Sequence, residues 1–185
     1  MTERPGARGR ILAAAAELFT CQGFNATSVN DLHTRAKVSK RTLYQHFPSK
    51  DELIIAYLTQ DQQSSPAHRL LGREELAPRS RLLELFTTLA EGAQPPLPDA
   101  LTAAVNEFPD PAHPVHRAAV SLTQARVAAL TGLARAAGAR DPERIGRRLA
   151  LLYSGAATGT LLGSPGEVVS DAYGMAAALL RDAVD

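Results

Sequence analysis

The sequence is poor in the residues that build disulfide frameworks and membrane spans. Its 185 residues include one cysteine, no tryptophan and 5% aromatic residues. A single cysteine excludes an intramolecular disulfide and favours a reducing compartment, and we expect Cys21 to be packed near the end of the first helix. No stretch reaches the roughly 20 apolar residues of a transmembrane helix, and the N-terminus lacks the apolar core of a signal peptide. These absences predict a cytoplasmic protein with no membrane partner.

Motifs of enzymes and metal proteins are also missing. The sequence has no glycine-rich phosphate loop, no nucleophile elbow and no HExxH pattern. His113 and His116 are three residues apart, but Pro114 lies between them, and no cysteine or additional carboxylate pair is nearby. We therefore expect no enzymatic activity, no metal site and no cofactor.

Acidic residues are absent between Arg35 and Lys50, although the whole chain has a formal net charge of only +1. All three lysines of the chain, Lys37, Lys40 and Lys50, lie in this region. Because the bulk charge is balanced, any contact with nucleic acid must come from a local patch and not from a polycationic molecule.

The same region, residues 27–53, predicts two short helices joined by a tight turn. Thr27 and Ser39 are each placed to cap a helix. Apolar residues recur on one face of each helix, at Val29, Leu32 and Ala36 in the first and at Leu43 and Phe47 in the second. This pattern is typical of a helix-turn-helix.

The rest of the chain also has helical periodicity, and no stretch alternates as a strand does. A polar stretch after Gln60, with Pro66 and Gly72, predicts a linker or a frayed helix end, and the prolines of residues 94–98 predict a loop. We therefore expect an all-α fold of about nine helices. Outside the helix-turn-helix, these helices are expected over residues 8–20, 49–60, 78–92, 99–107, 115–137, 142–162 and 165–184.

The last two of these helices are apolar over more than half of their circumference. They also have alanine and glycine where another backbone could approach closely. Burial inside one domain explains this pattern, and so does a four-helix interface between two copies of the chain. We prefer the homodimer, because a helix-turn-helix usually binds two half-sites about 34 Å apart, or a multiple of that distance.

A series of short motifs runs through residues 8–53. They are Glu17-Leu18-Phe19, Gly23-Phe24, Thr27-Ser28-Val29, Asp31-Leu32, Val38-Ser39, Thr42-Leu43-Tyr44, His46-Phe47 and Ser49-Lys50-Asp51-Glu52-Leu53. With these motifs, residues 8–53 resemble the DNA-binding domain of the TetR family of transcriptional regulators. The resemblance implies a DNA-binding domain over residues 1–53, a connecting fourth helix over 49–60, and a helical ligand-binding and dimerisation domain over 54–185.

The resemblance, together with the chemistry of DNA, also implies which residues bind it. Phosphates need cations and hydroxyls, whereas base edges need side chains that point out of the second helix of the motif. Leu43 and Phe47 are expected to point inward. The expected DNA contacts are Thr27, Ser28, Arg35, Lys37, Ser39, Lys40, Arg41, Thr42, Tyr44, Gln45, His46 and Lys50.

Three departures from the family pattern affect this site, and one of them is His33, which replaces a usually small residue. Lys37 stands in the turn where the family commonly has glycine, so it is expected in a left-handed or bridge conformation. Arg41 stands where many relatives have a small residue, and its guanidinium could bind guanine O6 and N7 or a phosphate.

The function that the resemblance implies is repression of transcription at a near-palindromic operator, relieved by a small apolar or amphipathic effector. Two alternatives are a helical small-molecule carrier without DNA specificity and a DNA binder that ignores both ligand and sequence. The second domain would bind the effector in a pocket lined by Phe86, Leu89, Leu101, Phe108, Val120, Leu122 and Tyr153, although these residues could simply fill a core.

Overall fold

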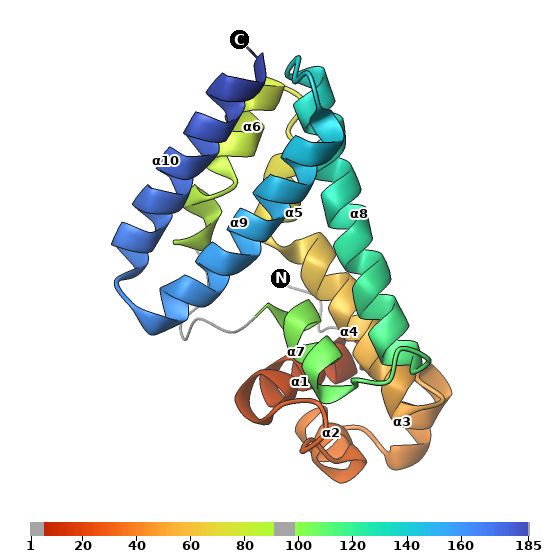
Figure 1. Cartoon of the computed structure of the whole chain (residues 1–185). Coiled ribbons are helices and arrows are strands. Elements are labelled where there is room, and N and C mark those ends of the chain that lie inside the picture. Colours follow the sequence, from red (N-terminus) through yellow and green to blue (C-terminus); the bar gives the residue numbers. More distant parts are fainter. Residues whose placement is uncertain (1–5, 91–98, 185) are drawn as a thin grey trace. The chain divides into compact units, whose positions relative to one another are not determined.

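Every regular element in the described part of the chain is a helix, as the sequence predicts. The computed structural model describes residues 6–90 and 99–184. The elements are α1 (Ala7–Gln22), α2 (Val29–Arg35), α3 (Lys40–His46), α4 (Lys50–Ser64), α5 (Pro66–Leu71), α6 (Pro78–Glu84), the 3-10 helix η1 (Thr87–Leu89), α7 (Ala100–Glu107), α8 (Pro114–Ala136), α9 (Pro142–Leu162) and α10 (Pro165–Val184) (Figure 1).

The helices group into two units. The first unit comprises Met1–Asp61 and Ala100–Val120, and the second comprises Gln62–Asp99 and Ser121–Asp185. Two helices, α4 and α8, therefore begin in the first unit and end in the second. The sequence predicts a single boundary after residue 53. In the structure the first unit also contains α7 and the start of α8, which come much later in the chain.

The core of the first unit contains an aromatic cluster. The ring centroids of Phe19 and Phe24 are 5.0 Å apart, and the Tyr57 ring lies 5.4 Å from Phe19 with its edge toward it. Burial raises the pKa of the Tyr57 hydroxyl to about 12. This cluster joins the end of α1, the turn after it and the middle of α4. Leu32 of α2 and Leu43 of α3 are buried in the same unit.

Serine and aspartate side chains start several helices. Ser39 and Asp141 cap α3 and α9 through their side-chain oxygens, as expected. Ser28, and not Thr27, caps α2: Ser28 Oγ accepts the Asp31 amide at 3.1 Å. Thr27 is instead fully buried, and its hydroxyl donates to the Gly23 carbonyl at 2.7 Å.

Three other predictions from the sequence were wrong. Residues from Pro66 onward form the short helix α5, because Ser65 caps it and a proline suits a first helical position. The expected continuous helix from residue 78 is divided into α6 and η1. Cys21 is exposed and not packed. Gly92 and the loop expected over residues 94–98 lie outside the described residues.

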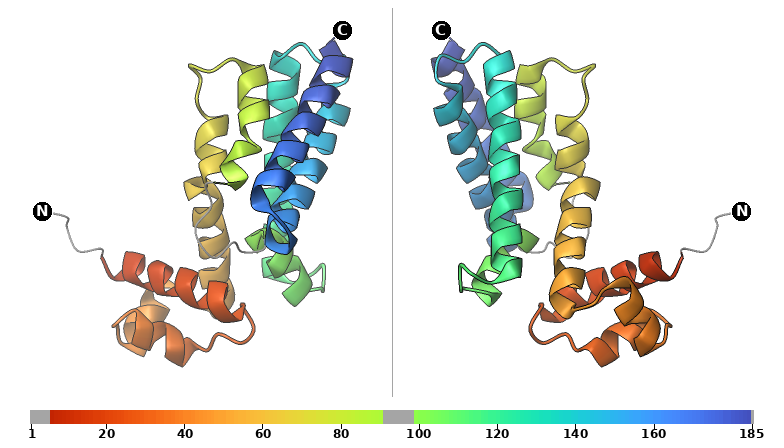
Figure 2. Two further views of the ribbon diagram at one scale, coloured as in Figure 1. Left: turned by 90° about the vertical axis from the view of Figure 1, so that its left-hand side faces the viewer. Right: turned by 90° about the vertical axis from the view of Figure 1, so that its right-hand side faces the viewer.

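The second unit is organised around α8, α9 and α10. The last two helices pack side by side, as Figures 1 and 2 both show. Leu149 of α9, Leu180 of α10 and Leu130 of α8 are fully buried in a common apolar core. The helices α8 and α9 approach closely at Gly146, where an added Cβ would lie 2.9 Å from the Cα of Thr131.

Candidate nucleic-acid interface

The turn between α2 and α3 is built around Lys37. Its φ of 52° is the one positive value among the described residues other than glycine, as the sequence predicts. The Lys37 amide donates to the Thr34 carbonyl, and the Val38 amide donates to the His33 carbonyl, each at 3.1 Å. These bonds end α2 and redirect the chain, so that Ser39 can start α3 two residues later.

The helix α3 has one buried face and one exposed face. Leu43 and Phe47 are 1% and 3% exposed, which confirms that they point inward. The guanidinium of Arg8 lies 5.2 Å from the centre of the Phe47 ring and covers it. Tyr44 is 41% exposed, so it does not serve as a core ring. The other exposed side chains of α3 are Lys40, Arg41, Gln45 and His46.

The hydroxyls expected to touch phosphate already have partners within the protein. Ser28 Oγ lies 2.6 Å from Asp31 Oδ2, and this hydrogen bond holds the pKa of the Asp31 carboxyl below its usual value. Ser39 Oγ accepts the Thr42 amide at 3.0 Å and lies 2.8 Å from the Thr42 hydroxyl. Phosphate oxygens only accept hydrogen bonds, so Ser28 must turn its hydroxyl proton away from Asp31 to contact a phosphate. In the Ser39–Thr42 pair one hydroxyl donates to the other, so the second hydroxyl proton remains able to bind a phosphate.

Two cations of the predicted surface are also engaged. Arg35 forms an exposed ion pair with Glu17 of α1. Lys50 donates from Nζ to the Asn25 carbonyl at 3.2 Å, so its ammonium lies beside the turn that follows α1. Partial burial lowers the pKa of Lys50, although the nearby carboxylates of Glu107 and Asp51 oppose that change. Lys37, Lys40 and Arg41 are exposed.

Comparisons with known proteins identify the family of this helix-turn-helix. The family described as bacterial regulatory proteins, tetR family, matches residues 11–57. Over nearly the whole length, the chain is similar to a TetR-family transcriptional regulator from Streptomyces coelicolor, with 31% identity, a TM-score of 0.86 and coverage of 97% of this chain and 96% of that one. The chain belongs to the TetR family.

Curated relatives of this TetR-family chain match it over short stretches. The HTH-type transcriptional activator FasR of Mycolicibacterium smegmatis is 49% identical over 51 residues, which are 28% of this chain and 23% of FasR. The HTH-type transcriptional regulator UidR of Escherichia coli is 42% identical over 66 residues, 36% of this chain and 34% of UidR. The matches thus span about a third or less of these relatives. The TetR-family chain is a helix-turn-helix transcriptional regulator.

A contact that sequence reasoning missed holds the turn after α1 of this TetR-family protein. Glu107, the last residue of α7, accepts the Phe24 amide at 2.9 Å and the Asn25 amide at 2.6 Å. Asn25 Nδ2 donates in return to the Glu107 carbonyl at 3.0 Å. No local pattern indicates this contact, because the partners are 82 and 83 residues apart in the sequence.

The histidines of the weak metal motif have partners within the first unit. His113 Nε2 lies 3.5 Å from Asp51 Oδ2, and its ring stacks on Phe108 with centroids 4.6 Å apart. His116 Nδ1 lies 2.8 Å from the Phe108 carbonyl oxygen. Among the described residues, no group of three or more His, Cys, Asp or Glu side chains could hold a metal ion. In the same part of the chain, no helix is sufficiently long and apolar to span a bilayer.

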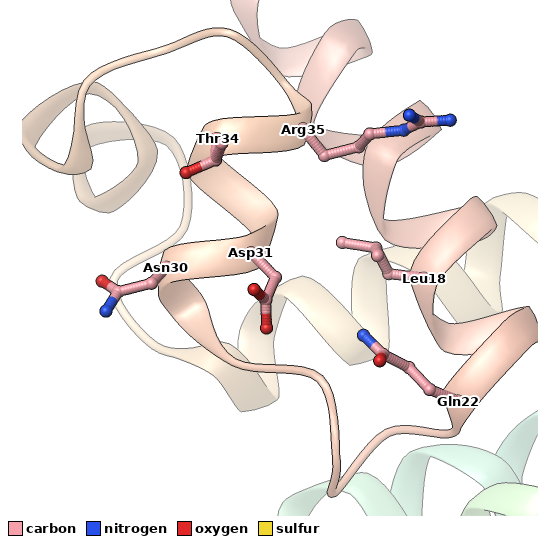
Figure 3. A pocket seen from close by; sticks show the side chains of 6 residues that line it. All are labelled: Leu18, Gln22, Asn30, Asp31, Thr34 and Arg35. Carbon is pink, nitrogen blue, oxygen red and sulfur yellow. The ribbon is translucent and has the colours of Figure 1, made fainter.

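A surface pocket lies between α1 and α2 (Figure 3). Leu18 and Gln22 project into it from α1, opposite side chains of α2 that include Asp31 and Arg35. None of the residues expected to bind an effector lines this pocket.

The residues expected to line an effector pocket are divided between the two units. Leu101, Phe108 and Val120 belong to the first. In the second, the Phe86 and Tyr153 rings meet edge to face with centroids 6.1 Å apart, and Leu89 is half-buried beside the same core. Leu122 is also half-buried. The effector pocket stays a prediction.

Proposed function

We propose that this TetR-family regulator is a repressor that binds a specific, near-palindromic operator as a homodimer and leaves it when a small apolar or amphipathic effector binds. The exposed face of α3 carries the proposal. There Lys40, Arg41, Gln45 and His46 project from a short helix whose opposite face is anchored by Leu43 and Phe47. A helix that is rigidly held on one side and cationic on the other suits insertion into the major groove.

Within this surface we assign two kinds of contact. Arg41 and Gln45, with Lys40, Thr42 and His46, read base edges, because guanidinium and amide groups match guanine and adenine in the major groove. Tyr44, Lys50, Lys37, Ser28, Ser39 and Arg35 contact phosphates. Thr27 is left out of the proposed surface, because its side chain is fully buried and its hydroxyl is bonded to Gly23.

The proposed homodimer forms through α9 and α10. Leu151 and Leu162 of α9 are 74% and 84% exposed, and Met175 of α10 is 58% exposed. Large apolar side chains with this exposure on two adjacent helices are typical of a surface that a second copy covers. A two-fold axis would then present two copies of α3 to two half-sites.

The proposed effector acts by linkage. If effector binding lowers operator affinity a hundredfold, the coupling free energy is about 2.7 kcal/mol, and the operator must weaken effector binding by the same factor. Repression is the direction we propose, although the relative FasR is named an activator. A reporter gene behind the operator decides the direction, since deletion of a repressor raises expression and deletion of an activator lowers it.

The assignment of base and phosphate contacts is tested with two matched variants. Arg41→Ala should weaken binding to the operator by about 1–3 kcal/mol and leave binding to scrambled DNA almost unchanged. Lys50→Ala should weaken both by a similar factor, because it removes a phosphate contact. Fluorescence anisotropy with both duplexes measures these affinities. If Arg41→Ala lowered the affinity for both duplexes equally, Arg41 would be a phosphate contact and not a base contact.

A further inference from the structure

Glu107, the last residue of α7, binds the turn between α1 and α2 through both its side chain and its backbone carbonyl. Both of its carboxylate oxygens accept backbone amides, Oε1 from Phe24 and Oε2 from Asn25, and its carbonyl accepts the Asn25 side chain. Hydrogen bonds to an ionised acceptor are about twice as strong as neutral ones. A single side chain thus fixes two consecutive residues of this turn.

Gly23 makes this arrangement possible. Its φ of +84° is one that side chains rarely adopt, and a Cβ at this position would lie 2.8 Å from Glu107 Oε1. The Gly23 amide itself donates to the Phe19 carbonyl and ends α1. The glycine therefore turns the chain and also leaves the space that the Glu107 carboxylate occupies.

The same turn touches the elements proposed to hold DNA. Lys50, the first residue of α4, donates to the carbonyl of Asn25, whose amide Glu107 accepts. Ser28, three residues after Asn25, starts α2 with its capping box. Glu107 is thereby connected through one short turn to a proposed phosphate contact on each of two helices.

We propose that Glu107 is a positioning residue for DNA binding, which holds the Gly23–Asn25 turn so that Lys50 and Ser28 face the phosphates. The inference rests on the proposed function, because it assumes that these two residues contact the DNA backbone. It also extends the DNA-binding machinery to α7, which is far from the helix-turn-helix in the sequence.

The sign of the effect separates positioning from simple electrostatics. Glu107 is acidic, so its removal makes the protein more positive, and charge alone predicts tighter binding to DNA. Loss of positioning predicts weaker binding. A purely structural role would lower the unfolding midpoint and leave the affinity of the folded protein unchanged.

The test compares Glu107→Ala and Glu107→Gln with wild type and with Glu52→Gln as the matched control. Glu52 is exposed on the first turn of α4, so this variant removes a charge near the same surface without touching the turn. Affinities for operator and scrambled DNA are measured at several salt concentrations, at a temperature at which unfolding curves show every variant folded.

We expect Glu107→Ala to weaken binding to both duplexes on the order of tenfold, the loss expected from one or two misplaced phosphate contacts. Glu107→Gln should lose less, because its amide oxygen still accepts one backbone N–H. Glu52→Gln should bind as tightly as wild type or tighter. Binding by Glu107→Ala within twofold of wild type, or tighter, overturns the proposal.

Amide hydrogen exchange supplies a second readout that does not depend on DNA. Exchange at Phe24 and Asn25 should be slow in wild type and fast in Glu107→Ala, and equal rates would overturn the proposal. The proposed function fails separately, if wild type does not prefer the operator to scrambled DNA. The comparison of Glu107 variants remains decisive in that case, because scrambled DNA also reports phosphate contacts.

Discussion

Lys37 shows how a single backbone conformation is tied to the proposed site. A side chain in the left-handed region costs about 1–2 kcal/mol relative to a helical conformation, whereas glycine adopts it freely. The chain nevertheless has an exposed lysine there, with φ 52°. A cation that contacts phosphate would explain why the strain is retained at this position.

We predict that Lys37→Gly changes stability and DNA binding in opposite directions. The free energy of unfolding should rise by up to about 1 kcal/mol, because relief of the strain exceeds the added backbone entropy of glycine. Affinity for all DNA should fall, and the salt dependence should decrease by about one counterion. Denaturant unfolding and anisotropy titrations measure the two effects. Lys40→Ala, which removes a charge from a helical position, should weaken DNA binding without the gain in stability.

The carboxyl of Asp31 predicts a pH effect at the start of α2. Hydrogen bonds from the Ser28 side chain and backbone hold its pKa below the usual value of 3.8. Because the folded pKa is depressed, the stabilising contribution is present above pH 3.8 and is lost as the pH falls through the lower, folded value. An NMR titration of this carboxyl should show the low pKa in wild type and a return toward 3.8 in Ser28→Ala. The same pKa in both proteins would show that the capping box does not form in solution.

At the scale of elements, local signals explain where helices start better than where they continue. The pattern Ser28-x-x-Asp31 forms a capping box, which is a local sequence signal for the start of α2. Ser65 before Pro66 is likewise a helix start, although the polar residues around it suggest a linker. The break between α6 and η1 has no comparable signal in the sequence.

Close packing of α8 against α9 predicts unequal effects of two glycine substitutions. In Gly146→Ala the new Cβ would lie 2.8 Å from the Thr131 amide nitrogen, so the helices must separate, and we expect a loss of about 1–3 kcal/mol. An added Cβ at Gly132 of α8 meets no atom within 4 Å. Gly132→Ala should therefore stabilise by up to about 1 kcal/mol, from helix propensity alone. Unfolding curves at one protein concentration measure both, and a Gly146→Ala protein as stable as wild type would refute the close approach.

At the scale of the whole molecule, the long-range contacts are the part that sequence reasoning could not supply. The buried and exposed faces of α3 depend only on the helical spacing of neighbouring residues, so the sequence predicts them correctly. The contact of Glu107 with Phe24 depends on the tertiary fold and not on any local pattern. The proposed α9 and α10 interface rests on the exposure of the large apolar residues Leu151, Leu162 and Met175.

We predict that charges on this exposed surface prevent dimer formation. Leu151→Glu combined with Met175→Glu should give a monomer in sedimentation experiments, because burying two unpaired carboxylates is strongly unfavourable. Ala129→Glu, at an exposed position of α8, is the matched control and should remain dimeric. The monomeric variant should also lose most of its operator affinity, since one half-site is then bound alone. A double variant that stays dimeric would place the interface elsewhere.

The most direct test of sequence-specific DNA binding is a titration of wild-type protein with DNA from upstream of its own gene and with a scrambled duplex of equal composition. At a fixed salt concentration we expect the upstream DNA to bind tighter on the order of a thousandfold, with both affinities falling as salt rises. Equal affinity for the two duplexes would contradict the proposal that α3 selects an operator.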